Sequence, residues 1–336
     1  MKILVTGGLG YIGSHTVVEL QSSGYEVVIV DNLSNSKIEV LDRITEITRI
    51  KPVYFNFDLG DKEACNDFFI NNSDINGIIH FAAYKAVGES VSNPLMYYRN
   101  NLESLMNIMD NMNIHNIPNL VFSSSCTVYG QPDILPVTEN APRKQAESPY
   151  GNTKKMAEDI IQDTVHASTL KAIALRYFNP VGAHPTALIG ELPLGVPNNL
   201  MPFITQTAAG IRKELSVFGE DYNTPDGTAI RDYIHVVDLA KAHVIAVKRL
   251  VEENNKLNYE IFNLGTGNGY SVLDVIKSFE KVTAINLNYK IIGRREGDIE
   301  KVWANTDFAN HELGWKAEQD IDEMTASAWK FQLELK

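Results

Sequence analysis

Six short apolar runs, rich in β-branched residues, divide the first half of the chain. They cover residues 3–5, 27–30, 53–57, 78–81, 120–123 and 173–175. Their apolar positions do not alternate with polar ones, as they would in a strand with one face in water. Continuous apolar character is typical of strands covered on both faces, so the runs predict a parallel sheet.

Amphipathic stretches with helical spacing separate these runs. They lie near residues 11–23, 37–48, 62–71, 94–112 and 152–166. Asn93 and Pro94 fit the N-cap and the first position of the fourth helix. Strands that alternate with helices indicate βαβ units, and therefore an α/β fold with a doubly wound parallel sheet of the Rossmann type.

The pattern changes after about residue 180. Prolines and glycines become frequent between residues 180 and 202, and helical spacing returns near 199–209, 236–250 and 271–281. Ser271 and Asp274 fit a capping box for the last of these helices. We therefore expect a dinucleotide-binding domain over residues 1–180 and a smaller C-terminal α/β domain for substrate over residues 181–336. Some segments of the second are expected to return to the first.

Composition excludes several classes of protein. The 336 residues carry a net charge of −12, whereas binding to nucleic acid or to an anionic membrane favours a basic surface. Two cysteines form no disulfide framework. No apolar run approaches the ~18 residues of a membrane span, and the first residues do not resemble a signal peptide. The sequence predicts a cytoplasmic protein, and no pair of histidines has the spacing and acidic company of a metal site.

A glycine-rich segment joins the first strand to the first helix. Gly7, Gly10 and Gly13 fit the spacing of a dinucleotide-binding loop in the required context, with a strand before and a helix after. Such glycines allow a tight turn and close approach of the pyrophosphate to the helix N-terminus. The alternative is a purely structural turn.

Asp31 ends the second strand, 18 residues after Gly13. A carboxylate there accepts hydrogen bonds from the adenosine ribose and repels a 2′-phosphate. The next basic residue, Lys37, lies too far along the chain from Asp31 to bind that phosphate. The cofactor expected is therefore NAD, not NADP.

Tyr150 and Lys154 stand four residues apart at the start of a predicted helix, so both lie on one face. Ser125 follows the fifth strand, at the sheet edge where substrates bind. A nearby ammonium and an oxidised nicotinamide both favour the tyrosine phenolate, which can then act as a base. Alone, the pair could be an exposed helix pair, but the glycine loop, Asp31 and Ser125 favour a catalytic role.

Longer blocks of sequence resemble the extended short-chain dehydrogenase/reductases, and within them the UDP-glucose 4-epimerase branch. The resemblance spans nearly the whole chain and rests on residues 5–15, 31–36, 85–90, 123–130, 176–184, 197–202, 231–239 and 294–298. The first two blocks are shared by many relatives, whereas the later ones are more specific to the epimerases.

The resemblance implies roles for further residues. Besides the glycines and Asp31, those implied to contact NAD are Tyr11, Ile12, Asn32, Asn35, Ser36, Asp58, Leu59, Phe81, Ala82, Lys85, Asn100 and Phe178. Those implied to contact the nucleotide-sugar are Asn179, Asn199, Leu200, Phe218, Arg231, Arg295, Asp298 and Val302. Two arginines suit a diphosphate because their guanidinium groups bind it in a fork.

The activity implied is reversible, NAD-dependent epimerisation at C4 of a UDP-hexose through a 4-keto intermediate. One alternative is an NDP-sugar dehydratase or decarboxylase, but those relatives carry an acid after the catalytic Ser/Thr, where this chain has Cys126 and Thr127. Another alternative is a non-catalytic NAD-binding protein, which would be expected to lose Tyr150 or Lys154.

Two further expectations concern the partner and the substrate range. The helices at 94–112 and 152–166 carry broad apolar surfaces and predict a homodimer through a four-helix contact, with Met106, Met112 and Ile161 extending the surface beyond what covers the sheet. Val302 stands where many bacterial members of the branch have tyrosine, which predicts room for UDP-N-acetylhexosamines. Tyr84 stands where the resemblance leads us to expect a smaller aliphatic residue near the nicotinamide.

Overall fold

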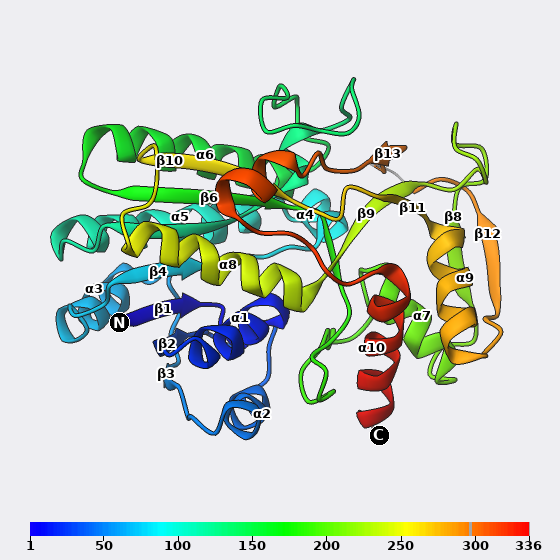
Figure 1. Ribbon diagram of the computed structural model, residues 1–336, viewed down its shortest axis with the longest axis horizontal. Helices are drawn as coiled ribbons and strands as arrows, with labels where there is room; N and C mark the ends of the chain where they lie inside the picture. The colour runs from blue at the N-terminus through cyan, green and yellow to red at the C-terminus, as the bar shows by residue number, and fades with distance from the viewer. Residues whose placement is uncertain (296–297, 336) are drawn as a thin grey trace.

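A seven-stranded parallel sheet forms the centre of the first lobe, in the order β10-β6-β5-β4-β1-β2-β3 (Figure 1). The computed structural model describes residues 1–295 and 298–335. The six predicted runs are all strands: β1 Lys2–Thr6, β2 Glu26–Val30, β3 Val53–Phe55, β4 Gly77–His80, β5 Asn119–Ser125 and β6 Lys171–Tyr177. The predicted doubly wound α/β fold is confirmed.

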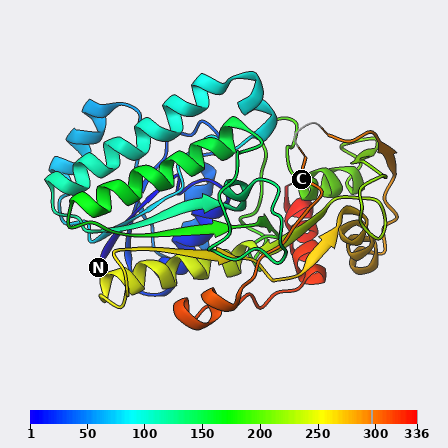
Figure 2. The same cartoon turned by 90° about the horizontal axis from the view of Figure 1, so that it is seen from above.

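Helices cover both faces of this sheet, which explains why its strands are apolar throughout. On one face lie α1 (Tyr11–Ser22), α2 (Glu39–Thr48) and α8 (Val236–Val251), and on the other lie α3 (Lys62–Asn71), α5 (Pro94–Ile114) and α6 (Pro149–Ala167) (Figure 2). Each face has its own cluster of buried side chains. Val17, Ile29 and Val247 belong to the first cluster, and Phe69, Ile108 and Ile161 to the second.

The strand order reverses between β1 and β4. β1 pairs with β2 on one side and with β4 on the other, so the connections leave the sheet in opposite directions on either side of this point. In open α/β sheets a crevice forms at the carboxyl ends of such strands. The glycine loop leaves β1 at this crevice, and Phe81 leaves β4 there.

Two elements of the first lobe were not predicted. The short helix α4 (Val87–Ser92) precedes α5, and β10 (Tyr259–Leu264) pairs with β6 as the edge strand. Together with α8, β10 brings residues from the C-terminal half of the chain back to the first sheet.

The second lobe is built from short strands and three helices. They are α7 (Leu200–Ala208), α9 (Val272–Thr283) and α10 (Ile321–Glu334). Their buried faces share a core that includes Met201, Phe279 and Met324. β8 (Leu215–Phe218) pairs with β12 (Tyr289–Ile292), while β9 (Ile230–His235) pairs with β7 (Asn179–Val181), β11 (Gly269–Ser271) and β13 (Lys301–Val302).

Figure 1 shows this lobe beside the carboxyl ends of the large sheet, with α10 at its inner side. Two short turns complete the structure, the 3-10 turn η1 (Cys126–Tyr129) and the π turn η2 (Ala309–Leu313). None of the helices in the described part of the chain has the length and apolar character needed to cross a membrane.

Candidate active site

One cleft of about 1560 Å³ runs along the carboxyl ends of the sheet and under the second lobe. Every residue singled out from the sequence as catalytic, cofactor-binding or substrate-binding lines it. Single ligand pockets usually measure about 300–1,000 Å³, so this cleft has room for a dinucleotide and a second nucleotide together. The local geometry of these lining residues indicates which part of a ligand each could contact.

The glycine loop is shaped for close approach of a phosphate group. Gly7 has a positive φ of 66°, and a Cβ there would lie 2.9 Å from the backbone nitrogen of Ala82. A Cβ on Gly13 would lie 2.2 Å from the carbonyl oxygen of Gly7. Gly10 is the N-cap of α1 and makes no side-chain cap, which leaves the first amides of the helix free toward the cleft. These features fit a dinucleotide pyrophosphate.

Asp31 is held in place by its neighbours. Its Oδ2 accepts a hydrogen bond from the Leu9 amide (3.0 Å), and its Oδ1 accepts from the Leu33 amide (2.9 Å) and the Ser36 hydroxyl (2.8 Å). The residue is 8% exposed, at the wall of the cleft. The carboxylate therefore links the glycine loop to the 31–36 turn and faces the place where a ribose would lie.

The remaining cofactor-side residues lie along the same wall. Asn32 donates a hydrogen bond to Asp58 (3.1 Å), which also caps the turn at Gly60. Phe81 and Ala82 follow β4, and Phe178 follows β6 and is buried. The others on this side are Tyr11, Ile12, Asn35, Leu59, Lys85 and Asn100.

The N-terminus of α6 presents the proposed catalytic tyrosine to the cleft. Ser148 caps the helix by accepting a hydrogen bond from the Gly151 amide, and Pro149 occupies the first turn. Tyr150 is thereby fixed in that turn. Thr153 donates to the Tyr150 carbonyl (2.7 Å) and accepts from Asn101 of α5 (3.1 Å), which ties this turn to the neighbouring helix.

Lys154 and Ser125 stand close to Tyr150. The Lys154 Nζ donates to the Ser123 carbonyl oxygen at 2.7 Å and lies 6.0 Å from the centroid of the Tyr150 ring. Ser125, at the end of β5, is 7% exposed and accepts a hydrogen bond from the Thr127 amide. The structure thus brings the three residues together in the cleft.

The protein alone does not lower the pKa of the tyrosine. Burial raises the pKa of Tyr150 well above its ordinary value, the Tyr177 phenol adds to the rise, and Ser125 lowers it. Burial also lowers the pKa of Lys154 to about 7. A positive charge next to Tyr150, such as that of an oxidised nicotinamide, would oppose this rise and favour the phenolate.

The sugar side of the cleft is lined by the second lobe. Arg231 of β9 forms an ion pair with Asp298 and donates to the Ile299 carbonyl oxygen (2.6 Å). Arg295 and Asn199 are exposed, and Phe218 is 38% exposed. Asn179 and Leu200 complete the sugar-side residues. Of the motif at 294–298, residues 296 and 297 lie outside the described part of the chain.

Val302 and Tyr84 both line the cleft. Val302 is 1% exposed and packs in a small cluster with Val128, Tyr129 and Phe178, so it belongs to a local core as well as to the cleft wall. The Tyr84 amide donates to Asn101 (2.8 Å), and its ring packs against Tyr97.

Glu191 is a cleft residue that the sequence analysis missed. Its Oε1 accepts a hydrogen bond from Asn199 Nδ2 (2.5 Å) and lies 3.6 Å from Lys85 Nζ. Its Oε2 is buried and accepts no hydrogen bond from the described residues. Glu191 lies in the loop rich in proline and glycine, where no local pattern distinguishes it from a solvated acid.

Comparison with known proteins agrees with this geometry. Residues 4–328 match the family model described as GDP-mannose 4,6 dehydratase. The UDP-glucose 4-epimerases of Bacillus subtilis (strain 168) and Homo sapiens are 51% and 47% identical, covering 99% and 98% of this chain and 97% and 96% of their own. The crystal structure of UDP-glucose 4-epimerase from Bifidobacterium longum in complex with NAD+ and UDP superposes with a TM-score of 0.95. It is 46% identical, and the match covers 99% of this chain and 98% of that one.

The chain belongs to the UDP-glucose 4-epimerase family. The family model that matches carries the name of a dehydratase, and the residues after Ser125 distinguish the two chemistries. A dehydratase needs an additional acid there, whereas burial raises the pKa of the Cys126 thiol to about 12 and Thr127 carries no acid at all. This epimerase-family site therefore lacks the second proton donor.

Proposed function

We propose that this chain is an isomerase that catalyses the reversible, NAD-dependent epimerisation of a UDP-hexose, UDP-galactose or UDP-glucose, at C4. The observation that carries the proposal is the convergence of Ser125, Tyr150 and Lys154 in a cleft with room for two nucleotides. The family membership and the lack of an additional acid at residues 126 and 127 support it.

The proposed chemistry assigns one task to each of the three residues. When bound, NAD supplies the acceptor for the C4 hydride and its donor on return. Tyr150 takes the proton of the 4-hydroxyl and gives it back to the 4-keto oxygen after the sugar has turned. Ser125 donates to or accepts from that oxygen and orders it for transfer, while the Lys154 ammonium favours the tyrosine phenolate.

On the cofactor side, the glycine loop would hold the pyrophosphate and Asp31 the adenosine ribose. The absence of a cation beside Asp31 in the 31–36 turn supports NAD over NADP. The residues from Asp58 to Leu59 and from Phe81 to Ala82 would line the rest of the cofactor.

On the sugar side, Arg231 and Arg295 would bind the diphosphate of UDP. Epimerisation requires the hexose to present both faces of C4 in turn, so the sugar itself must be bound loosely. Binding energy is then concentrated on UDP, remote from the reacting carbon. The remaining sugar-side residues would contact UDP and the hexose.

A direct test incubates the purified protein with UDP-galactose and separates the nucleotide-sugars by anion-exchange chromatography. The proposal predicts that UDP-glucose forms until both sugars are at equilibrium, from either direction. A 4-keto-6-deoxy product, or no conversion by protein with NAD added, would instead support the dehydratase or the non-catalytic alternative.

We further propose that UDP-N-acetylgalactosamine is also a substrate. The resemblance to the epimerases implies that residue 302 lies near C2 of the hexose. Valine, which is buried at the cleft wall beside Phe178, is smaller than tyrosine by most of an aromatic ring and so takes up less of the space there. Because such rejection is steric, removing the wall relaxes selectivity without adding attraction. The expected result is turnover of both sugars by the wild type, and at least a roughly tenfold selective loss of the acetylated sugar in Val302→Tyr. Equal loss of both sugars would refute this role.

A homodimer in the cytoplasm completes the proposal. Apolar side chains are exposed along α4, α5 and α6, including Val91, Leu95, Met106 and Met156, and would pair with a second copy. Two residues expected to extend this surface do not, because Met112 and Ile161 are fully buried against the sheet. Light scattering should give twice the chain mass at micromolar concentration, and a mass of one chain would contradict the dimer.

A further inference from the structure

A buried polar network lies next to the catalytic residues and takes no part in the chemistry described above. Its centre is the ion pair between Glu158 of α6 and Arg176 of β6, which are 1% and 2% exposed. Arg176 donates from Nε to Glu158 Oε1 (2.8 Å) and from Nη2 to Oε2 (2.6 Å). The hydroxyl of Ser124 also donates to Oε1, at 2.5 Å.

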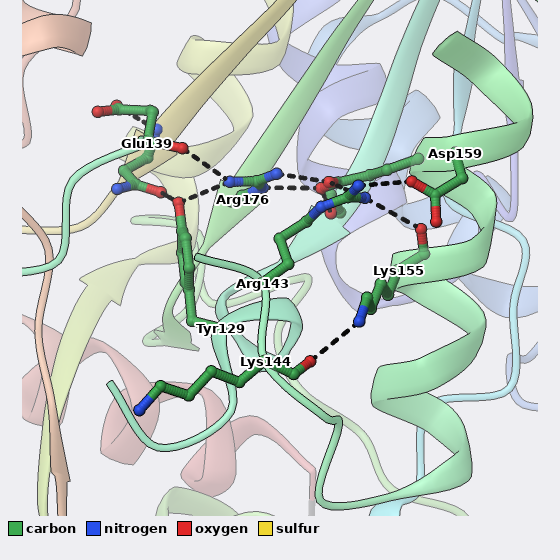
Figure 3. A network of polar contacts seen from close by, with 10 residues as sticks. Tyr129, Glu139, Arg143, Lys144, Lys155, Asp159 and Arg176 are labelled. Carbon is green, nitrogen blue, oxygen red and sulfur yellow. Dashed lines mark hydrogen bonds and ion pairs between the residues drawn. The ribbon is translucent and has the colours of Figure 1, made fainter. Parts of the chain in front are cut away.

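The network extends from this pair to three more segments (Figure 3). Arg176 Nη1 donates to the Tyr129 hydroxyl (2.9 Å) and to the Glu139 carbonyl oxygen (3.2 Å). The Tyr129 hydroxyl in turn donates to Asn263 of β10 (2.7 Å). A single set of hydrogen bonds therefore joins α6, β5, β6, β10, η1 and the loop at 139.

Members of this network stand next to catalytic residues in the sequence. Glu158 follows Lys154 by one helical turn, and Ser124 directly precedes Ser125. The carbonyl of Ser123, one residue earlier, accepts the hydrogen bond from Lys154. The network thus joins the helix and the strand that carry the reacting groups, one helical turn after Lys154 in α6 and one residue before Ser125 in β5.

A buried ion pair of this kind adds little net free energy to folding. Burying an ion pair costs about as much as its attraction returns, and well-packed apolar residues often serve as well. A bidentate pair with further hydrogen bonds does, however, fix the geometry of the elements that it joins.

The network also places a charge near Lys154. The titratable groups that face this lysine are Tyr150 and Glu158 on α6 and His80 on β4. Burial lowers the pKa of Lys154, and Glu158 opposes that effect. His80 is buried and its pKa is lowered to about 3, so it is neutral and adds no opposing charge.

We propose that Glu158 is a positioning residue for the epimerase reaction, which holds α6 in register with β5 and provides the negative charge one turn from Lys154. The inference rests on the roles given to Ser125, Tyr150 and Lys154 in the proposed function. It adds Glu158, Arg176 and Ser124 to the residues that determine the rate without touching the substrate.

The test is Glu158→Gln, which keeps the shape and loses the charge. Lys154 should then deprotonate at lower pH, so the alkaline limb of the kcat profile should move down by about one pH unit. At a pH on that limb, kcat should fall roughly tenfold. The KM for UDP-galactose and the amount of bound NAD should stay within about twofold, because the contacts in the cleft are unchanged.

Asp159→Asn is the matched control. Asp159 is the next residue on α6 and pairs with Arg143 at 2.5 Å (Figure 3). Arg143 also lies 3.5 Å from Glu158 Oε2, so this control changes the outer edge of the network but leaves the Glu158 charge in place. This variant should keep the wild-type pH profile. A Glu158→Gln variant that loses only thermal stability, with kcat and the pH profile unchanged, would overturn the proposal.

Two other variants keep the proposal testable if Glu158→Gln does not fold. Glu158→Asp retains the charge with a shorter reach, and Ser124→Ala removes one hydrogen bond from Glu158. Both should lower kcat several-fold while leaving the alkaline limb within a few tenths of a pH unit of wild type. Unchanged kcat in both would overturn the positioning role, whereas failure of the wild type to convert UDP-galactose would refute the proposed function itself.

Discussion

The cofactor side and the sugar side of the cleft are held by different kinds of contact. On the cofactor side, backbone amides fix Asp31, and glycines pack directly against neighbouring backbone at Gly7 and Gly13. On the sugar side, the contacts are between side chains: the ion pair Arg231–Asp298 and the hydrogen bond from Asn199 to Glu191.

This difference matches what each side has to do. Rigid backbone contacts suit a cofactor that stays bound through a catalytic cycle, because they lose little conformational entropy when the cofactor binds. A sugar that must turn within the site is served by side chains at the rim that can adjust. Variants on the two sides should therefore separate the chemistry, cofactor binding and substrate binding.

The largest effect is expected where the two sides meet. Tyr150→Phe removes the base but leaves the glycine loop and Asp31 intact, so kcat should fall by roughly 10²–10⁴-fold. NAD should still co-purify with the variant, as measured by absorbance after denaturation. A variant that keeps more than a tenth of the wild-type rate would show that Tyr150 is not the base.

Breaking the cofactor side should affect NAD alone. Asp31→Ala removes a carboxylate that would bind the ribose and that holds the Leu9 and Leu33 amides. We expect NAD affinity to fall about 100-fold, the size of one or two charge-assisted hydrogen bonds. At saturating NAD the KM for UDP-galactose should match wild type. A rise in that KM would show that the cofactor side also determines substrate binding, which would contradict the separation of the two sides.

Breaking the sugar side should give the opposite pattern, with a smaller effect. Because a carboxylate only accepts hydrogen bonds, Glu191 obliges Asn199 to turn its nitrogen inward and its oxygen outward. Glu191→Ala should raise the KM for UDP-galactose by roughly 10-fold at nearly constant kcat. Bound NAD should be retained, because the contact of Glu191 with cofactor-side Lys85 is long, at 3.6 Å, and Lys85 is about half exposed. Glu253→Gln, in a surface pair with Lys171, is the control with no expected change. Loss of NAD from the Glu191 variant would place this residue on the cofactor side.

The sequence was most informative where structure is local or repetitive. Uninterrupted apolar runs predicted six of the seven strands of the large sheet, and the helix at 62–71 has the predicted bounds. β10 was missed because Glu260 and Asn263 interrupt its apolar run. Both are paired with distant partners, Glu260 with Arg249 and Asn263 with Tyr129, which no local pattern can show. The helix α10 did carry a signal, the capping box of Asp320 and Glu323.

The same distinction applies to the cleft. Asp31, Ser125 and the glycine loop could be placed from spacing alone, because parallel strands bring their carboxyl ends to one edge. Phe81, Ala82, Phe178 and the sugar-side residues came from the resemblance to the family. Glu191 and Glu158 could not be placed in this way. Each is distinguished only by an ion pair with a residue that is not its neighbour in the sequence, Lys85 for Glu191 and Arg176 for Glu158. The lowered tyrosine pKa was also expected from nearby charges, whereas burial dominates in the protein alone.

The central claim is that hydride removed from the sugar returns to the same sugar. The most direct measurement follows absorbance at the wavelength of NADH while the purified protein, without added NAD, converts UDP-galactose, with the nucleotide-sugars separated at each time point. We predict that many equivalents of UDP-glucose form per protein while no NADH accumulates beyond the single equivalent that the protein can hold. NADH that rises in step with the consumed UDP-galactose once NAD is added would contradict the account, because it would identify a dehydrogenase.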